Sequence, residues 1–147
     1  MGVKQLCLTL EAEGDRNLGE CSKLAEPAAT VFRAWFMELA WRGFGRLRVV
    51  EGVRGLDREQ ELWGYGRSEL RCAQAGVPVK YARPGHRKVV FCLPEESMHV
   101  KCLAMDVDTG MYSSVDQARI RDVARKMGIT CGADWTVRDM NHYQVGE

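Results

Sequence analysis

The chain has 147 residues and a formal net charge of +1, with 28% charged and 46% hydrophobic residues. By length it is one domain, which buries about two thirds of the surface of its unfolded chain and therefore needs no disulfide bonds to fold. This charge balance gives no support to nucleic-acid binding, which usually requires a strong basic excess.

The first residues and the cysteines indicate the cellular compartment in which the chain is made. Residues 1–10 form a short mixed run, whereas a signal peptide has about 7 to 15 apolar residues before a cleavage site. No apolar run reaches the roughly 18 residues of a membrane span, so we expect synthesis in the cytoplasm and no stable membrane insertion. Six cysteines form no C-x-x-C pair, and in a reducing compartment most are expected to be small buried hydrophobic residues.

The first part of the chain predicts a loop, a helix and a strand. Residues 11–26 are polar and glycine-containing, which is typical of a loop. Pro27 suits a first helical turn, and the helix that follows should end near Gly43 and Gly45. The apolar positions with helical spacing are Ala28, Val31, Phe32, Trp35 and Leu39. Their aromatic rings indicate core packing rather than a sugar-binding platform, and residues 47–50 indicate a short strand.

The middle of the chain is less regular. Asp57 and Gln60 have the spacing of a capping box, which predicts a helix over residues 58–66. Residues 68–88 are interrupted by glycine and proline and predict a long loop bordering a cleft. His86 lies in this loop among basic residues, so we expect it to face solvent or substrate and not to bind a metal.

The last part of the chain alternates strands with one helix. Strands are expected at residues 89–91, 103–107, 129–131 and 142–145. Ser113 or Ser114 can cap a helix that Gly128 ends. We therefore predict an α+β fold, a small antiparallel sheet with helices packed against it, as a single domain over residues 1–147 in which residues 1–25 are only loosely assigned.

Two segments carry residues suited to zinc. Residues 97–106 contain His99 and Asp106, and residues 139–142 contain Asp139 and His142. A catalytic zinc takes three His or carboxylate ligands and leaves a fourth position to water, whose pKa falls to about 7. His99, Asp106 and His142 meet that requirement, and Asp139 could take the proton from the water and pass it to the leaving amine.

Spacing by itself leaves another interpretation open. A His and an Asp seven residues apart match no local zinc template such as HExxH. In that case His99 donates to a backbone carbonyl and Asp106 caps a turn. The choice between the two interpretations depends on the wider pattern of motifs.

Several motifs follow one another over residues 47–145. They are Glu51-Gly52-Val53-Arg54-Gly55, Glu59-Gln60, Leu62, Gly66-Arg67, the Ser97–Asp106 segment, Gly132-Ala133-Asp134-Trp135, and Asp139 with His142-Tyr143-Gln144. This order resembles the signatures S-x-H-x-x-G-x-A-x-D and D/E-x-x-H of the zinc D-alanyl-D-alanine carboxypeptidase and L-alanyl-D-glutamate endopeptidase family. That family belongs to the wider group that includes lysostaphin and the N-terminal domain of Sonic hedgehog.

The resemblance implies roles for individual residues. His99, Asp106 and His142 would bind Zn²⁺ in a cleft on the sheet, and Asp139 would be the base. Arg54 would bind the substrate and stabilise the oxyanion, although an Arg paired with Glu51 or Asp57 is the alternative. The supporting residues would be Ser97, Gln60 and Trp135. Ser97 is placed among them, and not assigned as a nucleophile, because no base that could activate it is evident.

Two positions depart from the family pattern. Cys102 stands where the family usually has Gly, and Gly55 stands where it usually has Ser. Cys102 matters for the backbone beside the metal, because glycine there can serve a close approach or a positive φ. Cys102 is also a potential competing ligand.

The resemblance implies a zinc peptidase of the peptidoglycan stem peptide. A chain of this size without an export signal or wall-binding module resembles a phage or prophage endolysin, a monomer released from the cytoplasm to the cell wall by a holin. Cleavage of the L-alanyl-D-glutamate bond is the first expectation, and D-alanyl-D-alanine carboxypeptidase activity is the alternative. A binding module that keeps the zinc fold without catalysis, or an accidental set of matches, also remains open.

Overall fold

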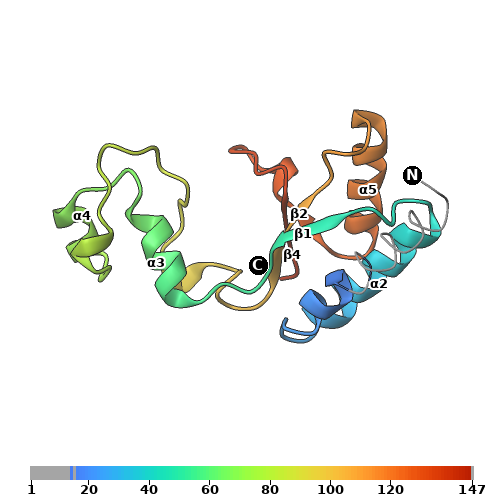
Figure 1. Cartoon of the computed structure of the whole chain (residues 1–147), viewed down its shortest axis with the longest axis horizontal. Coiled ribbons are helices and arrows are strands. Elements are labelled where there is room, and N and C mark those ends of the chain that lie inside the picture. The colour runs from blue at the N-terminus through green and yellow to red at the C-terminus, as the bar shows by residue number, and fades with distance from the viewer. Residues whose placement is uncertain (1–13, 15, 147) are drawn as a thin grey trace, which may run out of the picture. The chain divides into compact units, whose positions relative to one another are not determined.

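The computed structural model describes residues 14 and 16–146 as two compact units (Figure 1). The first unit comprises the chain up to Val53 together with the chain from Cys102 onward, and the second unit comprises Arg54–Lys101. That the chain folds as a single domain stays a prediction. Among the described residues, no helix combines the length and apolarity needed to cross a bilayer.

The first unit contains a four-stranded antiparallel sheet in the order β1-β2-β4-β3. Its strands are β1 (Arg48–Glu51), β2 (Ala104–Asp108), β3 (Thr130–Cys131) and β4 (His142–Gln144). All four lie where the sequence predicts a strand, so the predicted antiparallel sheet is confirmed.

Helices α2 (Ala28–Trp41) and α5 (Ser114–Lys126) cover one face of this sheet (Figure 1). Trp35 of α2 is fully buried, and its ring centroid lies 4.7 Å from that of Tyr143 on β4. Ser113 caps α5 by accepting a hydrogen bond from the Asp116 backbone N–H at 3.2 Å. The predicted core role of the α2 aromatics is therefore confirmed.

Strand alternation divides the side chains of the sheet between its two faces. Met105 and Val107 of β2 and Tyr143 of β4 are buried in the core beneath the helices. Because successive side chains point to opposite faces, Asp106 and His142 project from the other face. The helices thus hold the sheet from one side and leave these two polar side chains on the opposite side.

The second unit is built from short helices around a small core of Trp63, Cys72 and Val77. Its elements are α3 (Leu56–Gly64), α4 (Glu69–Gln74), η1 (Val79–Tyr81) and η2 (Pro94–Glu96). A Cβ on Gly64 would lie 2.0 Å from the Tyr81 carbonyl oxygen, so only glycine lets α3 approach η1 this closely.

Three predicted segments differ from the structure. Residues 16–21 are helical, so the loop predicted over residues 11–26 is wrong where the structure describes it. The long loop predicted over residues 68–88 contains α4, because Ser68 caps it by accepting from the Arg71 backbone N–H. Residues 89–91 form no strand, since the carbonyl oxygen of Val90 accepts a hydrogen bond from the Arg67 side chain instead of from a strand.

The predicted capping box of Asp57 and Gln60 is also wrong. Helix α3 begins at Leu56, with Gly55 as an N-cap residue that makes no side-chain hydrogen bond. Asp57 therefore lies inside the first turn, where a carboxylate interacts favourably with the helix dipole but does not cap the helix.

Among the described residues, Cys21, Cys72, Cys92 and Cys131 form no disulfide bond. Cys21, Cys72 and Cys131 are buried as predicted, whereas Cys92 is exposed and Cys102 is half-buried. Burial raises the pKa of Cys131 to about 11, so its thiol is protonated at neutral pH. Cys7 lies outside the described residues.

Cys102 has a φ of +61°, in the left-handed region that favours glycine. Its carbonyl oxygen accepts a hydrogen bond from the Ala25 backbone N–H at 2.9 Å, which links this turn to the chain before α2. The chain therefore keeps at this position the type of backbone for which the resembled family uses glycine.

We expect Cys102→Gly to stabilise the protein by about 1 kcal/mol. A non-glycine residue in this region costs of order 1–3 kcal/mol, which the higher entropy of unfolded glycine offsets only in part. Thermal unfolding should show the gain as a higher melting temperature. Cys102→Ala removes the same sulfur but keeps Cβ, so an equal gain in that control would show that φ is not the cause.

Candidate metal centre

Asp106 and His142 face each other across two neighbouring strands. They are register partners in the antiparallel pairing of β2 with β4. His142 Nδ1 lies 3.5 Å from Asp106 Oδ1, and the His142 side chain is buried whereas Asp106 is half-buried. Strand β2 pairs with β1 along its other edge, and Glu51 of β1 is the register partner of Asp106. The register shifts at a bulge between Val49 and Glu51.

Two of the three predicted ligands, Asp106 and His142, lie opposite each other in the first unit, and the third, His99, lies near the end of the second unit. The three side chains are of kinds that could hold a metal ion. Two imidazoles and one carboxylate are a donor set that zinc takes in catalytic sites, with ligand distances of roughly 2.0 to 2.2 Å. The side chains present thus fit a zinc ion, and their role as its ligands stays a prediction.

The short helix η3 (Gly132–Asp134) holds the chain that leads into β4. The Gly132 carbonyl oxygen accepts a hydrogen bond from the Asp139 backbone N–H at 3.0 Å, and the Asp139 carbonyl accepts one from His142 at 3.3 Å. A Cβ on Gly132 would lie 2.5 Å from the Asp139 carbonyl oxygen and 3.0 Å from His142 Cβ. Gly132 is therefore a close-approach position that brings residues 139 and 142 together.

An ion pair fixes η3 to α5. Arg125 donates to both carboxylate oxygens of Asp134, from Nε at 2.8 Å and from the NH2 nitrogen at 2.7 Å. These hydrogen bonds hold the pKa of Asp134 below its usual range. Asp134 therefore stays ionised in this structural contact, which is separate from the proposed proton transfer by Asp139.

The imidazole of His142 is held by two further side chains. The Trp135 ring centroid lies 4.9 Å from the His142 ring centroid, with the planes tilted by 43°. Gln144 Oε1 lies 2.8 Å from His142 Nε2. Trp135 thus contacts a candidate ligand, and its supporting role stays a prediction. Gln144 is a contact that the sequence interpretation missed.

In the second unit Arg54 is buried and paired. Its NH1 nitrogen donates to Glu59 Oε2 at 2.5 Å, and the Glu59 side chain is 1% exposed. Its backbone N–H donates to the His99 carbonyl oxygen at 3.3 Å. The alternative of a surface Arg is therefore wrong about exposure, and Glu59 on α3 supplies a buried carboxylate partner.

The remaining supporting residues also lie in this unit. Ser97 is buried at the end of η2, and its carbonyl oxygen accepts a hydrogen bond from the Lys101 backbone N–H at 3.1 Å. Gln60 is half-buried on α3, directly after Glu59. The Glu59-Gln60 motif could have indicated the partner of Arg54, since Glu59 carries the charge opposite to that of the nearby arginine.

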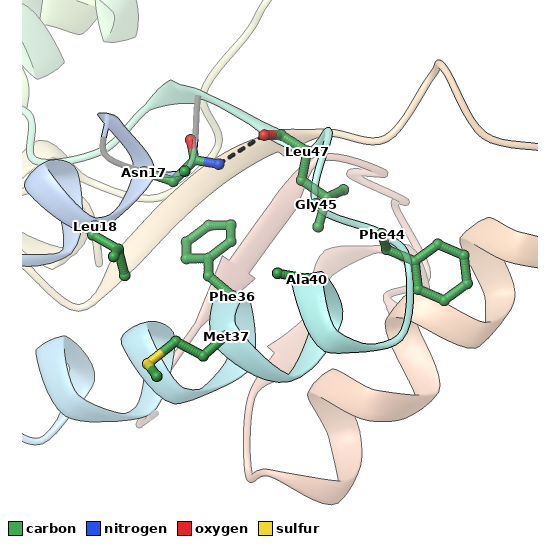
Figure 2. Close-up of a pocket in the computed structure, with 9 residues that line it drawn as sticks. Asn17, Leu18, Phe36, Met37, Ala40, Phe44, Gly45 and Leu47 are labelled. Carbon is green, nitrogen blue, oxygen red and sulfur yellow. Dashed lines mark hydrogen bonds between the residues drawn. The ribbon is translucent and has the colours of Figure 1, made fainter. Parts of the chain in front are cut away.

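The structure also has a small apolar pocket in the first unit, with a volume of about 90 Å³ (Figure 2). Beside it, Asn17 donates a hydrogen bond to the Leu47 carbonyl oxygen at 2.7 Å. The pocket is lined by Gly14, Asn17, Leu18, Phe36, Met37, Ala40, Phe44, Gly45 and Leu47. None of these side chains is titratable and none is a predicted site residue, so the pocket is separate from the candidate metal centre.

No family model matches the chain, and no curated protein matches it. The crystal structure of the L-Ala D-Glu endopeptidase ChiX of Serratia marcescens is similar, with a TM-score of 0.48 and 20% identity over 92% of this chain and 87% of that chain. A mutant of the vancomycin resistance D,D-pentapeptidase VanY, from a VanB-type resistance cassette and in complex with Zn(II), has a TM-score of 0.54. Its identity is 18% over 83% of this chain and 72% of that chain. The similarity to VanY shows the fold, and with it the α+β architecture that the sequence motifs imply is confirmed.

Proposed function

We propose that the chain is a zinc peptidase that hydrolyses an amide bond of the peptidoglycan stem peptide. The observation that carries this proposal is the set of His99, Asp106 and His142, which could hold a metal ion, with Asp106 and His142 set opposite each other by the register of β2 and β4. The fold shared with the zinc-bound VanY supports it, as do the motifs of the resembled peptidase family.

Other residues of the chain supply the remaining parts of such a reaction. When bound, zinc supplies Lewis acidity and makes a water acidic enough to react at neutral pH. Asp139 accepts the proton of the attacking water with its carboxylate and returns it to the leaving amine. Its backbone is fixed by hydrogen bonds to Gly132 and His142, and its side chain is exposed.

Arg54 is assigned to substrate binding and oxyanion stabilisation. Its guanidinium is oriented by the buried carboxylate of Glu59, and a fixed cation stabilises developing negative charge better than a mobile one. The guanidinium has five donor N–H groups, so it can donate to more than one acceptor at once. Glu59 is accordingly a positioning residue in this proposal.

Within this chemistry we favour the L-alanyl-D-glutamate endopeptidase, acting as a monomeric phage or prophage endolysin. The support is the resemblance of the sequence motifs to that family. In this role the protein is made in the cytoplasm and reaches the cell wall after release. The alternative is a D-alanyl-D-alanine carboxypeptidase.

The test is digestion of purified muropeptides by the purified chain, with the bound metal measured in the same sample. We expect stoichiometric zinc and products cut between L-Ala and D-Glu, lost with a chelator and restored by added zinc. Release of a terminal D-Ala would identify the carboxypeptidase instead. Bound zinc without any product would overturn the enzyme assignment in favour of a binding module.

A matched pair of histidine variants separates the metal centre from the rest of the chain. His142→Ala should lose both zinc and hydrolysis, because it removes one of the three proposed ligands. His86→Ala should keep both, since His86 is exposed and its ring packs against Tyr65, with centroids 5.1 Å apart.

A further inference from the structure

We infer that Gln144 is a positioning residue that decides which ring nitrogen of His142 is available to a metal. The inference rests on the proposed zinc site and adds to it a role for a residue outside the ligand set. It is argued from contacts within the sheet of the first unit.

The orientation of the Gln144 side-chain amide follows from its two hydrogen bonds. Its Nε2 donates to the Gly146 carbonyl oxygen at 3.3 Å, and its Oε1 lies 2.8 Å from His142 Nε2. Turning the amide over would place its oxygen against the Gly146 carbonyl oxygen, so two acceptors would face each other there. The atom of Gln144 that faces the imidazole is therefore the acceptor oxygen.

An acceptor at this place selects one state of the imidazole. Since Oε1 can only accept, His142 Nε2 must carry the proton and donate it. In a neutral imidazole the other nitrogen, Nδ1, then has the lone pair that binds a metal. Nδ1 is the nitrogen that lies 3.5 Å from Asp106 Oδ1, on the side of the second proposed ligand.

The sheet keeps Gln144 in place for this contact. His142 and Gln144 are two residues apart on β4, so their side chains project from the same face. Gln144 pairs with the small Ala104 on β2 and with Thr130 on β3, and is half-buried between these strands. Contacts of this kind around a metal-binding histidine typically change metal affinity by about 10- to 100-fold when they are removed.

The experiment compares Gln144→Leu with Gln144→Glu and the wild-type chain. Gln144→Leu keeps the approximate size but removes the acceptor, whereas Gln144→Glu keeps an oxygen that can accept from Nε2. We expect zinc affinity, measured by competition with a chelator, to fall about 10- to 100-fold in Gln144→Leu and to change only a few-fold in Gln144→Glu.

The second readout is the proton position in the metal-free protein. Nitrogen-15 NMR in mildly alkaline buffer, where imidazole is neutral, should show the proton on Nε2 of His142 in the wild type and in Gln144→Glu. In Gln144→Leu the Nδ1-protonated form should become populated. This measurement needs no metal and no activity, so it tests the contact between Gln144 and His142 even if the wild type binds no zinc. A wild type that binds no zinc would overturn the proposed function but not this contact.

Two results would overturn the inference. One is a wild-type His142 protonated on Nδ1 in the metal-free protein, which decides the matter even if Gln144→Leu does not fold. The other is a folded Gln144→Leu variant that binds zinc as tightly as the wild type, because a side chain with only a structural role in β4 would give that result.

Discussion

Replacing Asp139 by Asn is expected to slow hydrolysis of the stem peptide by about 10²- to 10⁴-fold while zinc stays bound. The amide of Asn has nearly the shape of the carboxylate but cannot accept the proton of the attacking water. The backbone hydrogen bonds of residue 139 to Gly132 and His142 do not involve its side chain and should persist. Turnover of purified muropeptides and the zinc content of the same sample measure the two effects separately.

A nearby carboxylate in the same unit serves as the control for this variant. Asp134→Asn weakens the ion pair with Arg125, so it should lower stability but leave most of the turnover at a temperature where the variant is folded. If Asp139→Asn turned over substrate as fast as the wild type, another group would take the proton. If this variant lost its zinc, residue 139 would act through the metal centre instead.

Replacing Gly132 by Ala is expected to lower the free energy of unfolding by about 1–3 kcal/mol, as overpacking of a tight site does. The added methyl group would lie 2.5 Å from the Asp139 carbonyl oxygen, and this neighbour is backbone that cannot rotate away. The turn from Asp139 to His142 must therefore move. Because a displacement of about 1 Å at a reacting group can cost about 10²-fold in rate, we also expect a loss of turnover of that order.

Gly19→Ala is the matched control for the glycine prediction. Gly19 lies in the helical segment of residues 16–21, and a Cβ there would meet no atom within 4 Å. Since alanine favours a helix over glycine by roughly 0.5–1 kcal/mol, this variant should be as stable as the wild type or more so. Denaturant unfolding and muropeptide turnover of both variants make the comparison, and equal behaviour of the two would contradict the close approach at Gly132.

The structure adds a physical reason to two departures from the family pattern. Cys102 keeps a φ of +61° although it is not glycine, so the backbone path at this point does not depend on glycine. Gly55 is the N-cap of α3 and makes no side-chain hydrogen bond there, which is the place where a serine could cap the helix. Neither departure removes one of the three predicted metal ligands.

Local patterns in the sequence predicted the helices and strands in which the spacing of apolar residues matches the spacing of buried side chains. Helix α2 is an example, because its buried apolar residues recur at helical spacing and face the same core. The same holds for β2, where Met105 and Val107 alternate with Asp106. Helix α4 and residues 89–91 were predicted wrongly, because a serine cap and a hydrogen bond from Arg67 decided their conformation, and periodicity reports neither.

The sequence by itself determined the residue types of the candidate site, since imidazole and carboxylate groups recur in the order of a known set of motifs. Only the tertiary structure decided how they meet: β2 and β4 pair in a register that sets Asp106 opposite His142. It also supplied Glu59 for Arg54 and Gln144 for His142. The physical reason is that strand register and side-chain hydrogen bonds depend on packing between segments distant in the chain, which no local spacing specifies.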